Sequence, residues 1–254
     1  MITSWYKKFN KYSYLDDSCV GVRKNLMLIA NDKVKNLYIL VGPPAVGKST
    51  WIKNNVPDSF VVSRDDIVES VASELGLTYD DLFKSPDKSL PVGHVDEKLG
   101  TVIERPQYLP KFLPDKVWDK ITKANGTVHK RFQQRLLDAK SSGQDVVVDM
   151  TNMTRRARAR MLDNFSDLIN YNKKVVDFSF QGEELEKAIK DVSKFRSKQI
   201  SEEGGSKTIP DHVFDSMVSS YEKPSDEEGF DEIVSVDDRT RILDQARTIN
   251  KINQ

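Results

Sequence analysis

The sequence is poor in the residues that build disulfides, zinc sites and membrane spans. Among its 254 residues there is one cysteine, Cys19, which excludes an internal disulfide and favours a reducing cytoplasm. The three histidines are widely separated and show no metal-ligand spacing. The apolar stretches are no longer than a strand, whereas a membrane span needs roughly 18 residues. We therefore expect a cytoplasmic protein without a membrane partner.

Net charge and the N-terminal composition exclude further classes. Because 39 basic and 39 acidic side chains cancel, no overall charge indicates a nucleic-acid partner. The densest basic cluster is "RRARAR", residues 155–160, which suits either a solvated helix face or a contact with nucleic acid. Residues 1–18 carry charges and aromatics where a signal peptide requires an apolar segment. The chain is long enough for one or two globular domains.

Strand-like and helical segments alternate along the chain. Short β-rich runs predict strands at residues 37–41, 60–63, 145–149, 174–180 and 232–236. Apolar residues at helical spacing predict helices at residues 48–55, 64–75, 128–142, 154–169, 183–199, from Pro210 onward and at the C-terminus. This alternation predicts an α/β fold, in which helices flank a parallel sheet.

The stretch "GPPAVGKST", residues 42–50, joins a predicted strand to a predicted helix. It matches the pattern G-x-x-x-x-G-K-[ST] at Gly42, Gly47, Lys48 and Ser49. In such a loop backbone N–H groups surround a phosphate, the lysine reaches the outer phosphates and the hydroxyl holds magnesium. The predicted nucleotide site comprises Gly42, Pro43, Pro44, Ala45, Val46, Gly47, Lys48, Ser49 and Thr50, with Ser49 as the metal ligand.

Other nucleotide-binding classes lack their signatures in this sequence. A GTPase would need a base-reading motif such as N-K-x-D, and a motor ATPase would usually need an apolar strand that ends in an acid pair. The run "VVVDM" ends in one acid, Asp149. A kinase is therefore the class to test against the remaining residues.

A second acidic segment, "SRDD" at Ser63–Asp66, lies at the end of the next predicted strand. Ligands of open parallel sheets bind at this edge. A carboxylate there can accept the proton of an attacking hydroxyl, so we assign Asp65 as the general base. Arg64 is a candidate for binding a substrate phosphate, and Asp66 fits better as a cap of the following helix.

Four segments carry a family resemblance: "GPPAVGKSTW", "SRDD", "VVVDMTN" and "SKTIPDHVFDSMVSSYEKPSDEEGFDEIV". Together they resemble the kinase domain of polynucleotide 5′-hydroxyl kinases, which include bacteriophage enzymes and the kinase module of animal end-healing proteins. The resemblance covers residues 36–72 and 144–236. It implies a P-loop kinase that uses ATP and Mg²⁺ to phosphorylate the 5′-hydroxyl end of DNA or RNA.

The resemblance also implies roles for individual residues. Lys48 and Asp65 would be catalytic. Members of the family also have a lid helix whose arginines contact the phosphates, and the corresponding residue here would be Arg196. Three residues would line the site near substrate and metal: Asp149, Thr151 and Asn152. For the last two, a simple strand-to-helix cap is an equally good interpretation.

Two positions depart from the family pattern. Where relatives often carry a second lid arginine, this chain has Glu203 and Gly204, with Lys207 nearby. Where the phage enzymes have an arginine three residues after the base, it has Val68. Either another cation holds the acceptor strand, or the acceptor is not a polynucleotide.

The regular pattern is interrupted at residues 77–125, where five of the ten prolines fall. We expect a loop-rich insertion with at most one short helix. Its aromatics and lysines suit either single-strand binding or the core of a small subdomain. The predicted organisation is an N-terminal extension (1–35), a P-loop kinase domain (36–236) and a C-terminal helix (237–254).

Three functions follow as hypotheses. The first is a polynucleotide 5′-hydroxyl kinase, with a nucleic-acid end as its substrate. The alternative enzyme is a P-loop kinase of a small hydroxyl acceptor such as a nucleoside, sugar or antibiotic. The third is a non-catalytic, nucleotide-responsive binding module, which would require Asp65 to be idle.

Overall fold

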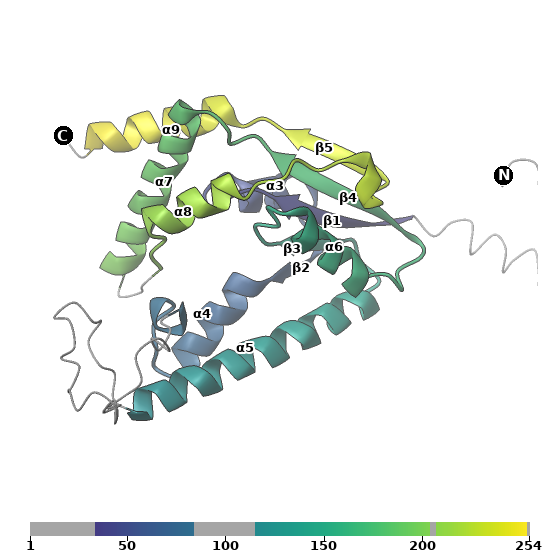
Figure 1. Ribbon diagram of the computed structural model, residues 1–254, viewed down its shortest axis with the longest axis horizontal. Helices are drawn as coiled ribbons and strands as arrows, with labels where there is room; N and C mark the ends of the chain where they lie inside the picture. Colours follow the sequence, from purple (N-terminus) through teal and green to yellow (C-terminus); the bar gives the residue numbers. More distant parts are fainter. Residues whose placement is uncertain (1–33, 84–114, 204–206, 253–254) are drawn as a thin grey trace, which may run out of the picture. The chain divides into compact units, whose positions relative to one another are not determined.

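A parallel five-stranded sheet forms the centre of the computed structural model, which describes residues 34–83, 115–203 and 207–252. The chain divides into two units, residues 1–35 and 36–254, and most of the first lies outside the described residues. The strands are β1 (Lys35–Val41), β2 (Phe60–Ser63), β3 (Val146–Asp149), β4 (Tyr171–Phe178) and β5 (Glu232–Val236). Their order in the sheet is β2-β3-β1-β4-β5 (Figure 1). The predicted α/β fold is thereby confirmed.

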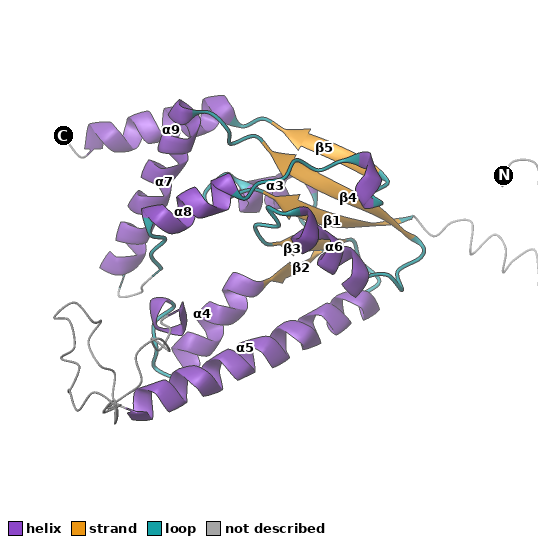
Figure 2. Ribbon diagram, in the orientation of Figure 1, coloured by secondary structure: helices purple, strands orange, loops and turns teal. Residues whose placement is uncertain are grey.

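Helices lie on both sides of the sheet (Figure 2). They are α3 (Lys48–Asn55), α4 (Arg64–Glu74), α5 (Asp115–Ser141), α6 (Arg155–Asn164), α7 (Glu183–Glu202), α8 (Asp211–Ser219) and α9 (Arg239–Ile252). Two 3-10 turns, η1 (Asp80–Phe83) and η2 (Asp226–Glu228), complete the described elements. Every described helix is too short or too polar to span a bilayer.

The apolar residues of β1 explain why both faces of the sheet are covered. Leu37 and Ile39 point to one face and pack with residues of α5 and α6. Leu40 points to the other face and packs with residues of α3, α7, α8 and α9. A strand without a polar face must be covered on both sides, which the crossover helices of a parallel sheet provide.

The structure differs from the predicted elements mainly around the proposed insertion. Helix α5 begins at Asp115, ten residues before the end of the predicted insertion. The turn η1 lies near the start of that insertion. Residues 84–114, which hold five of the ten prolines, lie outside the described residues. Helix α6 ends at Asn164, five residues early, because the chain turns there and enters β4.

Arg158 of α6 is fully buried, unlike its basic neighbours in "RRARAR". Its Nε and Nη2 donate to the two carboxylate oxygens of Glu228, each at 2.7 Å. Its Nη1 donates to the carbonyl oxygens of Asn152 and Met153, each at 3.2 Å. This arginine therefore joins α6 to η2 and to the segment after β3, whereas Arg156 stays exposed.

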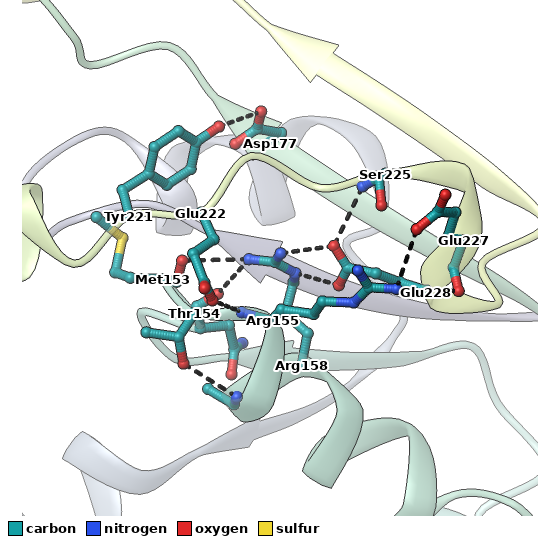
Figure 3. Close-up of polar contacts among 12 residues, drawn as sticks. Met153, Thr154, Arg155, Arg158, Asp177, Tyr221, Glu222, Ser225, Glu227 and Glu228 are labelled. Atoms are coloured by element: carbon teal, nitrogen blue, oxygen red, sulfur yellow. Dashed lines mark hydrogen bonds and ion pairs between the residues drawn. The ribbon is translucent and has the colours of Figure 1, made fainter.

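Further polar contacts hold residues 221–228 against the sheet (Figure 3). The hydroxyl of Tyr221 donates to Asp177 Oδ2 of β4 at 2.7 Å. The backbone N–H of Glu222 donates to the carbonyl of Met153 at 2.9 Å. The segment is thus tied to β4 and to the end of β3 at separate points.

Replacing Glu228 by Gln will destabilise the protein strongly, because the buried guanidinium of Arg158 loses its counter-charge. Breaking a buried ion pair on one side typically costs about 3–5 kcal/mol of unfolding free energy. Urea unfolding measures the loss. The matched control is Glu227→Gln, whose pair with Arg155 spans 3.5 Å between side chains 81% and 52% exposed. We expect the control to change stability by less than about 1 kcal/mol. Equal effects of the two variants would contradict the prediction.

Candidate active site

The loop between β1 and α3 contains residues with positive φ angles, a conformation that favours glycine. Gly47 caps α3 with φ 111°, and Ala45 has φ 67°. Side chains disfavour such angles, so the glycine is required at position 47. A Cβ atom there would also lie 2.2 Å from Nη2 of Arg241, at the start of α9. Loop and C-terminal helix are therefore in direct contact.

The side chain of Lys48 folds back onto this loop and contacts its backbone. Its Nζ donates to the carbonyl oxygens of Gly42 and Pro43, each at 2.9 Å. Burial lowers the pKa of Lys48, while the charges of Asp149 and Asp65 act in the opposite direction. The ammonium is thus held where the helix N-terminus and the loop N–H groups make an anion site.

A cavity of about 420 Å³ opens beside the loop. It is lined by Pro44, Ala45, Gly47, Lys48, Ser49, Thr50, Lys53, Asp65, Glu69, Asp149, Ser193, Arg196, Ser197, Ile200, Lys207 and Ile209. Its size is within the ordinary range of small-ligand pockets. The walls come from the loop, α3, α4, the end of β3, α7 and the segment before α8.

Asp65 lies in the first turn of α4, directly after β2. Ser63 caps this helix by accepting from the backbone N–H of Asp66 at 3.3 Å. The Asp65 carboxylate accepts from the hydroxyl of Tyr79 at 3.1 Å and pairs with Lys207 at 3.3 Å. Its side chain is 55% exposed, so a substrate hydroxyl can reach it.

Asp149 ends β3, where it stands in register with Ser63 of β2. Burial raises the pKa of Asp149, and the charge of Lys48 opposes that shift. Among the described residues no group of three or more His, Cys, Asp or Glu side chains could hold a metal. Ser49 and Asp149 line the cavity and could hold a Mg²⁺ ion, with nucleotide phosphates and water as its remaining ligands.

Arg196 of α7 also lines the cavity. Burial and the neighbouring charge of Arg241 lower its pKa. Arg241 in turn donates to Asp238 at 2.9 Å and to the carbonyl of Val46 at 3.4 Å. Two guanidinium groups near the phosphate loop favour an anion in the cavity, because it would relieve their mutual repulsion.

Several predicted site residues do not line the cavity. Three residues of the loop are buried and are not part of the cavity lining: Gly42, Pro43 and Val46. Arg64 is exposed and lies outside the lining. The Asn152 amide is buried and donates to the carbonyl of Leu40 at 2.9 Å. The carbonyl of Thr151 accepts from the backbone N–H of Gly42 at 3.0 Å, so both residues hold the loop in place.

Sequence reasoning missed three polar residues at the site. Glu69 and Tyr79 reach the cluster around Asp65 from α4 and the turn before η1. Arg241 reaches the loop from α9, about 200 residues along the chain. Helical spacing after Asp65 could have indicated Glu69, since residues i and i+4 share a helix face. The sequence indicated Tyr79 only as one of the aromatics of the proposed insertion, and it held no signal for Arg241.

Replacing Lys48 by Met will weaken ATP binding, because the buried ammonium is the cation closest to the loop. Hydrogen bonds to charged groups contribute about 1.5–3 kcal/mol, so the affinity should fall about 10- to 100-fold. Calorimetric titration with ATP and Mg²⁺ measures the change. Lys140→Met is the control, since that lysine pairs with Asp167 and does not line the cavity. Undiminished affinity in the Lys48 variant would place the nucleotide elsewhere.

Comparison with known proteins gives several distant structural similarities and one family match. Similar solved structures include a candidate kinase from Chloroflexus aurantiacus, with 13% identity, a TM-score of 0.44 and coverage of 87% of this chain and 99% of that one. A gluconokinase from Sinorhizobium meliloti has 14% identity, a TM-score of 0.31 and coverage of 87% and 94%. A structure from the PezAT toxin-antitoxin system of Streptococcus pneumoniae has 10% identity, a TM-score of 0.39 and coverage of 94% and 97%.

No curated protein matches the sequence at a significant level. A family model described as "AAA domain" matches residues 37–224, which is well over half of the chain. The matched range includes the phosphate loop, Asp65, Asp149 and Arg196. The chain therefore belongs to the AAA domain family, and its fold is that of a P-loop kinase-like phosphotransferase.

Proposed function

We propose that the protein is an ATP-dependent kinase that transfers the γ-phosphate of ATP to the 5′-hydroxyl end of a polynucleotide. The observation that carries the proposal is a single cavity lined both by the phosphate-loop residues Lys48 and Ser49 and by the carboxylate of Asp65. A hydroxyl acceptor between the two would face a phosphate on one side and a base on the other. A nucleotide-binding module without catalysis has no need for that carboxylate.

In this reaction Asp65 accepts the proton of the acceptor hydroxyl as the hydroxyl oxygen attacks the γ-phosphorus. A new P–O bond forms, the bond to the β-phosphate oxygen breaks, and ADP leaves in line. Lys48 and Arg196 offset the negative charge on the transferring group. Mg²⁺, when bound at Ser49, supplies further charge neutralisation.

A nucleic-acid acceptor is supported by a pair of aromatic side chains next to Asp65, the proposed general base. The rings of Tyr79 and Phe83 lie 4.8 Å apart, and the Tyr79 hydroxyl contacts Asp65. Phe83 is 55% exposed, so its ring is accessible for stacking. Base stacking on such a ring contributes to single-strand binding without sequence preference. The resemblance of the motifs points to the same acceptor.

A small hydroxyl acceptor is the second candidate, favoured by the charges on the acceptor side. Helix α4 brings two carboxylates to the cavity, Asp65 and Glu69, whereas Arg64 lies outside its lining. Val68, where the phage enzymes carry an arginine, is 2% exposed and packs in the core. Besides Lys48 and Arg196, the described lining offers Lys53 and Lys207 as cations for a strand phosphate.

Replacing Asp65 by Asn will lower the phosphotransfer rate and leave ATP binding unchanged, because the amide cannot accept the proton. General-base catalysis contributes about 100- to 10,000-fold, and we expect a kcat loss of that order. Transfer of labelled γ-phosphate to a 5′-hydroxyl oligonucleotide measures the rate. The control is Asp66→Asn, which removes a neighbouring charge outside the cavity lining. An unchanged rate in the Asp65 variant would remove that residue from the mechanism.

The acceptor class is tested by salt dependence. A polynucleotide held by several cations loses affinity steeply as salt rises, because counterions compete for its phosphates. We expect a steep slope for a 5′-hydroxyl oligonucleotide and labelled product on that strand alone. A nucleoside mixture and a 5′-phosphorylated strand are assayed beside it. Label among the nucleosides, with a shallow slope, would establish the small-acceptor kinase instead.

A further inference from the structure

Both carboxylate oxygens of Asp65 are already engaged by hydrogen-bond donors. The hydroxyl of Tyr79 donates to Oδ1 at 3.1 Å, and the ammonium of Lys207 lies 3.3 Å from Oδ2. The two donors also contact each other, since the Lys207 Nζ lies 4.9 Å from the centre of the Tyr79 ring. The three groups form a closed triangle, which holds the carboxylate plane in one orientation.

Lys207 is itself held from several sides. Its ammonium pairs with Glu69 at 2.6 Å, and its carbonyl accepts from the hydroxyl of Ser197 on α7 at 2.7 Å. The next backbone N–H, that of Thr208, donates to Asp80 Oδ1 at 2.9 Å. Lys207 is 25% exposed, against 49% for Glu69, so it is the inner member of the pair. Its position is therefore determined by both α4 and α7.

Both donors keep their protons. Burial raises the pKa of Tyr79, and the charge and hydrogen bond of Asp65 raise it further. Burial lowers the pKa of Lys207, but the contacts with Glu69 and Asp65 outweigh this effect and leave it raised. A protonated phenol and an ammonium can each only donate to the carboxylate in this arrangement.

We infer that Tyr79 and Lys207 are positioning residues for Asp65, a role that rests on the function proposed above. A carboxylate has about four lone-pair sites, so two donors leave sites free for the acceptor hydroxyl while preventing rotation of the group. Lys207 lines the cavity together with Lys48 and is attached to α7, which also carries Arg196. Orientation of the base is thus coupled to the position of the helix that carries the phosphate-binding arginine.

A stability role explains this cluster poorly. The two carboxylates that meet Lys207 are half exposed, and ion pairs of that kind contribute little to folding. The Tyr79 side chain can keep its ring packing against Phe83 without its hydroxyl. Removing either donor should therefore change catalysis while leaving the unfolding transition in place.

Tyr79→Phe should lower kcat about 10- to 100-fold, since small displacements of a catalytic group have effects of this size. The KM for ATP and the urea midpoint should not change. Lys207→Met should lower kcat similarly, and Lys207→Arg should restore part of the rate because it retains the charge. The matched controls are Tyr171→Phe and Lys198→Met, whose polar groups contact Gln144 and Glu202 outside the cavity lining.

The decisive experiment introduces Tyr79→Phe and Lys207→Met separately into the Asp65→Asn variant. Groups that act through one residue are strongly non-additive, so neither change should lower the residual rate further. A further drop would show that they act independently of Asp65 and would overturn the inference. So would wild-type kcat in both single variants, or an effect confined to the KM for ATP. Full activity of Asp65→Asn alone would remove Asp65 from the mechanism and would overturn the inference too. Absence of transfer to a 5′-hydroxyl oligonucleotide by the wild-type protein would instead refute the proposed function, so the two failures are distinguishable.

Discussion

Parallel pairing of three neighbouring strands is the constraint on which the site depends. β2 pairs with β3 and β3 with β1, so their carboxyl ends meet at one edge of the sheet. The phosphate loop follows β1, Asp65 follows β2, and Asp149 ends β3. The hydrogen bond from the Gly42 N–H to the Thr151 carbonyl joins two of these ends directly. No single segment forms the cavity, because each of the three strands leads to a different part of its lining.

Much of this arrangement could be predicted from local pattern. Alternating strands and helices give the α/β fold, and the loop motif locates the phosphate site because its glycines and lysine are needed at fixed spacing. The place of Asp65 directly after a strand predicts that it lies at the site, because parallel sheets bind ligands at this edge. The structure brings Lys48, Asp65, Asp149 and Arg196 to the same cavity.

The rest depends on packing between distant segments, which local pattern does not report. Arg158 looks like its basic neighbours in sequence, yet it is buried because Glu228, 70 residues later, turns back to meet it. Asn152 looks like a substrate ligand, but a positive φ of 43° turns its amide toward Leu40. Tyr79 reaches Asp65 only because the turn before η1 folds against α4.

The contact between Gly47 and Arg241 changes where the functional unit ends. By sequence, the last 18 residues are an appendix to a kinase domain that closes at residue 236. In the structure α9 supplies a guanidinium that contacts the Val46 carbonyl of the phosphate loop, and a side chain at residue 47 would displace it. A fragment ending at Val236 would keep every residue of the nucleotide motif and lose part of the wall that shapes it. A substitution at residue 47 would therefore disturb both the backbone of the phosphate loop and the contact with Arg241.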